Sequence, residues 1–224
     1  MQTVYYSLMR NLLALLLLAA SAKPLPAQDG AKTAAPRPGS LVDSHEGVSI
    51  WIEPWIQAGR YKEKFPKKSP FNGGIVAIHV TFSNDNEQGV KVDLQRIRLL
   101  VQIGEDNRQE LAPLSAEDVA DTVLLKANGK DPTSRRVPLP IPVGQSKPSR
   151  DAKWTELRDA CQNAGVPSGV LAAHSTVAGL IYFDLRGEID LLQTAHLYIP
   201  NLANMGDNQP LSYFDIDLSH GSSN

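Results

Sequence analysis

Trp51 and Trp55 are the first residues whose type and spacing suit recognition of a ligand. Both fall on one side of a segment with a period of two, opposite the apolar residues of that segment. Large aromatic side chains on a nominally outer face are either covered by another part of the protein or used for contact. We expect helices further along the chain to supply the cover, and contact with a ligand is the alternative.

The segment 60–68 combines basic and aromatic side chains. It holds five basic residues against one acid, in a chain whose formal net charge is −2. Such a patch suits an anionic lipid or an acidic polymer, while a solvated loop between strands is the plainer interpretation. Together with the two tryptophans it supplies the candidate binding residues, which are Trp51, Trp55, Tyr61, Lys64, Phe65, Lys67 and Lys68.

Carboxylates and histidines on predicted strands could serve acid–base or metal chemistry. Asp215 and Asp217 share one strand face, and Asp184 lies on another strand. A cluster of these carboxylates would serve hydrolysis or bind calcium. His79 and His196 would meet only if their strands were neighbours. We expect all of these side chains to lie on the solvent-exposed faces of sheets, and we expect no metal site.

The recognisable catalytic motifs are absent from the sequence. There is no phosphate-binding glycine loop, no GxSxG elbow and no SxxK arrangement. The single cysteine, Cys161, lies on the apolar stripe of a predicted helix, so we expect a buried, inert thiol and no internal disulfide. No catalytic residue and no cofactor is predicted.

The N-terminal residues have the pattern of a secretory signal peptide. Arg10 precedes an apolar run at 12–20, and the small residues at 20–22 form a cleavage site, with Ala27 as a second option. The run is shorter than the roughly 20 residues needed to span a bilayer. We therefore expect export to the periplasm or beyond the cell, with no transmembrane span after cleavage.

Period-two alternation predicts strands at 48–52, 75–82, 90–103, 180–185, 197–199 and 213–218. The alternation shifts by one near Gln95 and Arg96, which indicates a β-bulge or a bend. A capping box at Ser115 and an apolar stripe from Asp151 to Ala164 predict two helices. The alternating prolines at 138, 140 and 142 favour an edge strand over 137–143, with a polyproline II segment as the alternative.

Short antiparallel-type strands separated by turns indicate a mainly β protein built as a sandwich. The predicted organisation is a signal peptide at 1–22, a flexible linker at 23–46, a β-sandwich domain at 47–219 and a tail at 220–224. A helical insertion occupies about 115–165 of the domain.

Several blocks of residues resemble strands of exported bacterial immunoglobulin-like domains of unknown function. The blocks are 178–185 (AGLIYFDL), 195–200 (AHLYIP), 213–216 (YFDI) and the earlier 80–84 (VTFSN). The resemblance implies an immunoglobulin-like antiparallel β-sandwich and carries no functional residues. The two inserted helices and the proline-rich segment depart from a minimal domain of that kind.

These observations favour a non-catalytic binding or accessory module of the cell envelope. Its partner would be an envelope protein, a glycan or an anionic surface, and the slightly acidic chain argues against nucleic acid. Two alternatives remain open, namely a carboxylate-dependent extracytoplasmic hydrolase and a structural subunit of an envelope assembly.

Overall fold

The computed structural model describes residues 40–104, 107–127 and 151–219, all within the unit Ala35–Asn224. The predicted signal peptide, the proline-rich segment 137–143 and the tail 220–224 lie outside the described residues. No helix among the described residues is long and apolar enough to cross a membrane.

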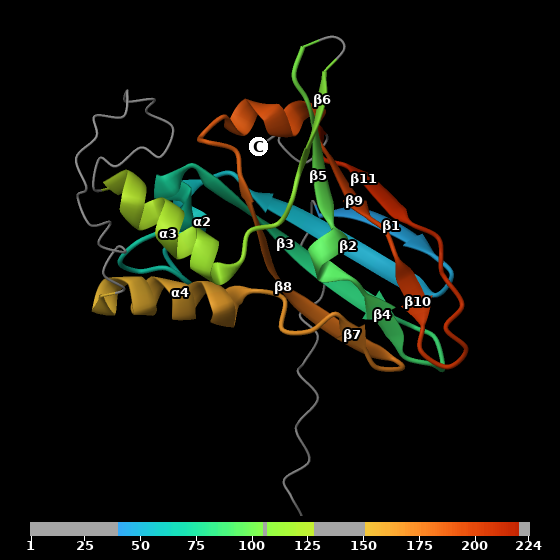
Figure 1. The fold of residues 1–224 in the computed structure, drawn as a ribbon. Coiled ribbons are helices and arrows are strands. Elements are labelled where there is room, and N and C mark those ends of the chain that lie inside the picture. The colour runs from blue at the N-terminus through green and yellow to red at the C-terminus, as the bar shows by residue number, and fades with distance from the viewer. Residues whose placement is uncertain (1–39, 105–106, 128–150, 220–224) are drawn as a thin grey trace, which may run out of the picture. The chain divides into compact units, whose positions relative to one another are not determined.

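Strands in the described residues form three antiparallel sheets (Figure 1). The first sheet has the order β1 (Leu41–His45), β2 (Val48–Trp55), β3 (Ile75–Asn84) and β8 (Ser175–Asp184). The second has the order β10 (Leu202–Asn204), β4 (Val90–Val92) and β7 (Val170–Leu171). The third has the order β11 (Phe214–Asp217), β9 (His196–Ile199), β5 (Arg98–Gln102) and β6 (Arg108–Leu111).

Short helices connect these strands. They are α2 (Ala58–Tyr61), η2 (Pro70–Gly73), η3 (Leu94–Arg96), α3 (Ala116–Ala127), α4 (Ala152–Ala164) and η4 (Ile189–Thr194). The protein is therefore mainly β with antiparallel sheets, as the alternation predicts, while the immunoglobulin-like arrangement stays a prediction.

The main core lies between the first sheet and the other two. Alternate apolar residues of β2 and β3, such as Ile50 and Val80, share one buried cluster with Leu99 of β5 and Leu197 of β9. This arrangement explains the period of two, because one face of each strand must be apolar to enter this core.

The opposite face of the first sheet is covered by helices. Trp55, Ala77 and Tyr182 of that face share a second buried cluster with Val119 of α3 and Leu157 of α4. Helices α3 and α4 lie side by side over β3 and β8 (Figure 1). The expected cover over Trp55 is therefore present, and β3 is buried on both of its faces.

Both predicted helices are capped at their N-termini, the first by the predicted capping box at Ser115. The Ser115 hydroxyl accepts from the Asp118 amide at 3.1 Å, and the Asp118 carboxylate accepts from the Ser115 amide at 3.3 Å. At the start of α4, Asp151 Oδ1 accepts from the Trp154 amide at 2.9 Å. Each side chain satisfies a helix N–H that has no partner within the helix.

The first strand begins earlier than the sequence predicts. Residues 23–46 are predicted as a linker, yet Leu41–His45 forms β1 and pairs with β2 from Leu41 opposite Ile52 to His45 opposite Val48. Glu46 and Gly47 have φ values of 51° and 73°, which suit the two-residue turn of a hairpin. The short and mostly polar sequence of β1 gives little alternation, so pairing with β2 decides its conformation.

The bulge or bend predicted near Gln95 and Arg96 is a bend, formed by a turn of 3-10 helix. These residues belong to η3, where the Asp93 side chain accepts from the Gln95 amide. The turn of helix separates β4 of the second sheet from β5 of the third sheet. The shift in alternation therefore marks a change of sheet.

Candidate functional site

A cleft lies between helix α4 and the loop that follows α2. Its volume is about 290 Å³, and its apolar wall consists of Phe65, Pro66, Leu157 and Ala160. Phe65 and Leu157 are each only 3% exposed, because both also belong to the second core. The wall is thus fixed by the packing of the helical layer on the sheet.

Charged side chains form the rest of the lining. Lys67 and Lys68 come from the loop, and Lys153 and Glu156 come from α4. Lys67 Nζ lies 2.8 Å from Glu156 Oε1, and no described carboxylate pairs with Lys68 or Lys153. Three ammonium groups against one carboxylate give this apolar cleft a net positive border.

The sequence of α4 explains how its residues reach the cleft. Lys153, Glu156, Leu157 and Ala160 follow one another at spacings of three, one and three, so they share one helix face. Trp154 Nε1 donates to Asp121 Oδ1 at 2.6 Å and thereby ties α4 to α3. The cleft face of α4 is therefore held in a fixed orientation.

The loop is held in place by Tyr61. Its carbonyl oxygen accepts from the Phe65 amide at 2.7 Å, and its ring lies 6.1 Å from the Phe65 ring. The Tyr61 hydroxyl donates to the Trp55 carbonyl and accepts from the Ala77 amide, both at 2.8 Å. Burial raises the pKa of the Tyr61 hydroxyl above its usual range, so it stays protonated and able to donate.

The seven residues predicted for binding fall into three groups. Phe65, Lys67 and Lys68 line the cleft. Trp55 and Tyr61 are buried in the second core, where their rings meet edge to face with centroids 5.4 Å apart. The remaining two lie away from the cleft lining, with Trp51 half-buried on β2 and Lys64 exposed.

Sequence reasoning missed the contribution of α4 to the cleft. Its residues there follow a pattern of i, i+3, i+4 and i+7, which is visible in the sequence between Lys153 and Ala160. The pattern carries no information about which loop will face it. The pairing of α4 with residues 65–68 depends on how the helical layer packs on β3 and β8.

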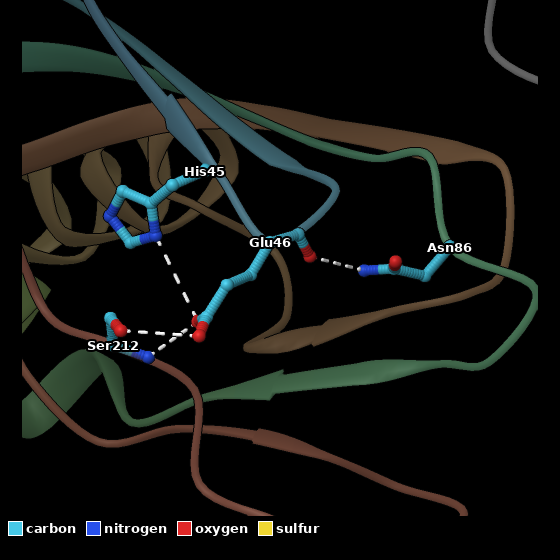
Figure 2. A network of polar contacts seen from close by, with 4 residues as sticks. All are labelled: His45, Glu46, Asn86 and Ser212. Carbon is cyan, nitrogen blue, oxygen red and sulfur yellow. Dashed lines mark hydrogen bonds and ion pairs between the residues drawn. The ribbon is translucent and has the colours of Figure 1, made fainter.

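A second polar network joins the first hairpin to the segment before β11, as Figure 2 shows. The Glu46 carboxylate accepts from the Ser212 amide at 2.6 Å and from the Ser212 hydroxyl at 3.2 Å. The Glu46 carbonyl accepts from Asn86 Nδ2 at 2.9 Å. His45 Nδ1 lies 3.8 Å from Glu46 Oε2.

This network differs from a serine-hydrolase triad. In such a triad the imidazole bonds the serine hydroxyl, whereas here the carboxylate receives that hydroxyl. The His45 ring instead stacks on Phe214, with centroids 3.8 Å apart and an angle of 16° between the planes. The network therefore ties the turn of the first hairpin to the segment before β11.

The histidines and carboxylates predicted on strand faces do not all gather at one site. His79 and Asp184 lie in the first sheet, whereas His196, Asp215 and Asp217 lie in the third. Among the described residues, no group of three or more His, Cys, Asp or Glu side chains is placed to hold a metal ion. His196 Nδ1 does lie 3.0 Å from Asp215 Oδ1, in a partly exposed pair.

Cys161 is buried in the second core, as its helical stripe predicts. Burial raises the pKa of its thiol to about 12. A protonated, enclosed thiol is a poor nucleophile, so Cys161 has a packing role. The neighbouring Tyr182 hydroxyl donates to the Cys161 carbonyl at 3.0 Å, and burial raises the pKa of Tyr182 as well.

Comparisons with known proteins add little. No protein-family model matches this chain, and no curated protein matches it. Among solved structures, the chain is similar to a functionally unknown protein from Listeria monocytogenes EGD-e. The two are 14% identical, 72% of this chain and 71% of that chain are covered, and the TM-score is 0.34.

Proposed function

We propose that this protein is an exported, non-catalytic binding module that takes an anionic ligand into the cleft between residues 65–68 and α4. One observation carries the proposal, namely an apolar cavity of about 290 Å³ bordered by three lysines and one carboxylate. Ligand sites are typically concave and mostly apolar, with a few polar groups that fix orientation. The signal-peptide pattern at 1–22 and the immunoglobulin-like sandwich belong to the same proposal.

The chemistry of the lining supports binding over hydrolysis. A hydrolase of the kind considered above needs convergent carboxylates or an activated nucleophile. Asp184 and Asp215 lie in different sheets, and the cleft is lined by ammonium groups, one carboxylate and hydrocarbon. Such a set attracts and orients an anion. It suits an anionic surface or an acidic envelope component as the partner.

Calorimetric titration of the full chain with inorganic pyrophosphate tests the proposal. We expect binding that weakens at least tenfold in the double variant Lys68→Gln/Lys153→Gln, because each lost charge-assisted contact is worth about 1.5–3 kcal/mol. Lys91→Gln is the matched control, since Lys91 is exposed on β4 and does not line the cleft. Equal affinity in the double variant and the control would disprove the site.

A further inference from the structure

We infer that the ligand of this cleft is a single-chain anionic amphiphile, such as an alkyl phosphate or alkyl carboxylate. The inference rests on the proposed function and assigns the ligand's chemical class. The headgroup would lie at Lys68 and Lys153, and the hydrocarbon chain along Pro66 and Ala160, over the nearly buried Phe65 and Leu157.

The separation of polar and apolar lining favours an amphiphile over a wholly polar anion. Apolar side chains supply four of the eight lining residues, and two of them continue directly into the second core. A sugar phosphate or a free phosphate would leave the exposed part of this wall, chiefly Pro66 and Ala160, against water. A hydrocarbon chain would remove the wall from water, and each buried methylene would add to affinity.

The size of the cleft limits how much of the ligand it holds. Its volume of about 290 Å³ lies just below the range for sites that enclose drug-sized ligands. It therefore suits one short chain, or the first part of a longer one. Two acyl chains side by side would exceed it.

Glu156 sets the charge that the headgroup meets. Its carboxylate already pairs with Lys67 at 2.8 Å, so Lys68 and Lys153 are the lining lysines left to face an incoming anion. Glu156 thus acts as a specificity residue, which neutralises one lysine and repels a headgroup that approaches Lys67. The variant Glu156→Gln would free Lys67 and should tighten anion binding several-fold.

A chain-length series tests the inference on the full protein. The probes are inorganic phosphate and butyl, hexyl and octyl phosphate, titrated by calorimetry at concentrations where the alkyl phosphates are monomeric. While the chain still fits, we expect each added methylene to lower the dissociation constant about fourfold, which corresponds to about 0.8 kcal/mol. Octyltrimethylammonium, with the same chain and the opposite charge, should bind at least tenfold more weakly than octyl phosphate.

The variant Ala160→Leu tests the contribution of the ligand's hydrocarbon chain to affinity separately from that of its headgroup. Its larger side chain would fill the apolar wall and leave the charges of the lysines unchanged, so the gain in affinity per methylene should disappear. Thermal unfolding checks that the variant is folded. The comparison of octyl phosphate with octyltrimethylammonium needs no variant at all, and it remains decisive if Ala160→Leu does not fold.

The outcomes distinguish the inference from the proposed function. If phosphates bind through Lys68 and Lys153 but chain length adds nothing, the amphiphile is wrong and the anion-binding function stands. If no member of the series binds, both fail. If the cationic probe binds as well as octyl phosphate, the lysines do not select the ligand and the inference is overturned.

Discussion

The hydroxyl of Tyr61 bridges the Trp55 carbonyl and the Ala77 amide, in place of a direct hydrogen bond between the two strands. Trp55 and Ala77 are the last paired residues of the β2–β3 ladder, and the Tyr61 hydroxyl bonds both backbones at 2.8 Å. The side chain thus links the loop that leads to the cleft with the end of the sheet. Tyr61 is fully buried, so no water replaces these two bonds readily.

Tyr61→Phe should therefore destabilise the protein. The variant keeps the ring but leaves the Ala77 amide and the Trp55 carbonyl without this partner, which costs about 1–3 kcal/mol. Urea unfolding measures the change as a shift of the midpoint at constant slope. Tyr213→Phe is the control, because Tyr213 is 59% exposed and its loss of a hydroxyl should change stability by less than about 0.5 kcal/mol. Equal stability of Tyr61→Phe and wild type would show that the buried bonds contribute nothing.

The sequence predicts the strands that enter the main core and misses those at the margins. β3, β8, β9 and β11 each place alternate apolar residues in the main core, so their pattern is strong in the sequence. β6 is exposed along most of its length, and β7 and β10 have two and three residues. Pairing with a neighbour decides the conformation of such short segments, and that pairing has no local signal.

The candidate site, too, could be predicted only in part from the sequence, because tertiary packing leaves no local signal. Phe65, Lys67 and Lys68 lie within one short run, so their composition alone draws attention to them. The aromatic residues Trp55 and Tyr61 look similar in the sequence, yet the helical layer buries them. Lys153 and Glu156 come from a helix about 85 residues away from the loop, and only the packing of that helix brings them to the cleft.

The turn between β1 and β2 depends on Gly47. Its φ of 73° lies in the left-handed region, and an added Cβ would lie 2.2 Å from Asn86 Oδ1. Gly47→Ala should destabilise the protein by about 1–2 kcal/mol from the backbone conformation alone, with a further loss as Asn86 moves from the Glu46 carbonyl. Differential scanning calorimetry should show a lower melting temperature.

Gly59→Ala is the matched control for that substitution. Gly59 lies in α2, and an added Cβ there meets no atom within 4 Å. Alanine favours the helix and restricts the unfolded chain, so stability should rise by about 0.4–1 kcal/mol. If both glycine variants lost stability equally, the left-handed turn would not be the cause.

The buried thiol predicts how stability depends on alkaline pH. The pKa of Cys161 rises from 9.0 to about 12 on folding, so the folded state holds the proton more tightly than the unfolded state. This stabilisation is fully present below about pH 9 and is lost as pH rises toward about 12, at about 1.4 kcal/mol per pH unit. Tyr61 and Tyr182, whose pKa values are also raised, add to the loss above about pH 10.

Urea unfolding at a series of pH values from about 7 to about 10.5 checks this dependence. In Cys161→Ala the decline should begin near pH 10, where the tyrosines titrate in the unfolded state, instead of near pH 9. A thiol reagent at about pH 8 gives a second readout, with slow labelling of the native protein and fast labelling in urea. Rapid labelling of the native state would contradict the burial of Cys161.

The bond between Trp154 and Asp121 should contribute to the position of α4. Trp154 Nε1 donates to the Asp121 carboxylate at 2.6 Å, whereas Trp55 Nε1, in the same core, has no hydrogen-bond partner among the described residues. Trp154→Phe should therefore lower the free energy of unfolding by about 1.5–3 kcal/mol more than Trp55→Phe does. Trp55→Phe measures the effect of the smaller ring without the loss of a hydrogen bond. Asp121→Asn keeps an acceptor oxygen, so its free energy of unfolding in urea should lie between those of wild type and Trp154→Phe.

Because α4 supplies half of the cleft lining, Trp154→Phe should also weaken pyrophosphate binding, and Trp55→Phe should leave it unchanged.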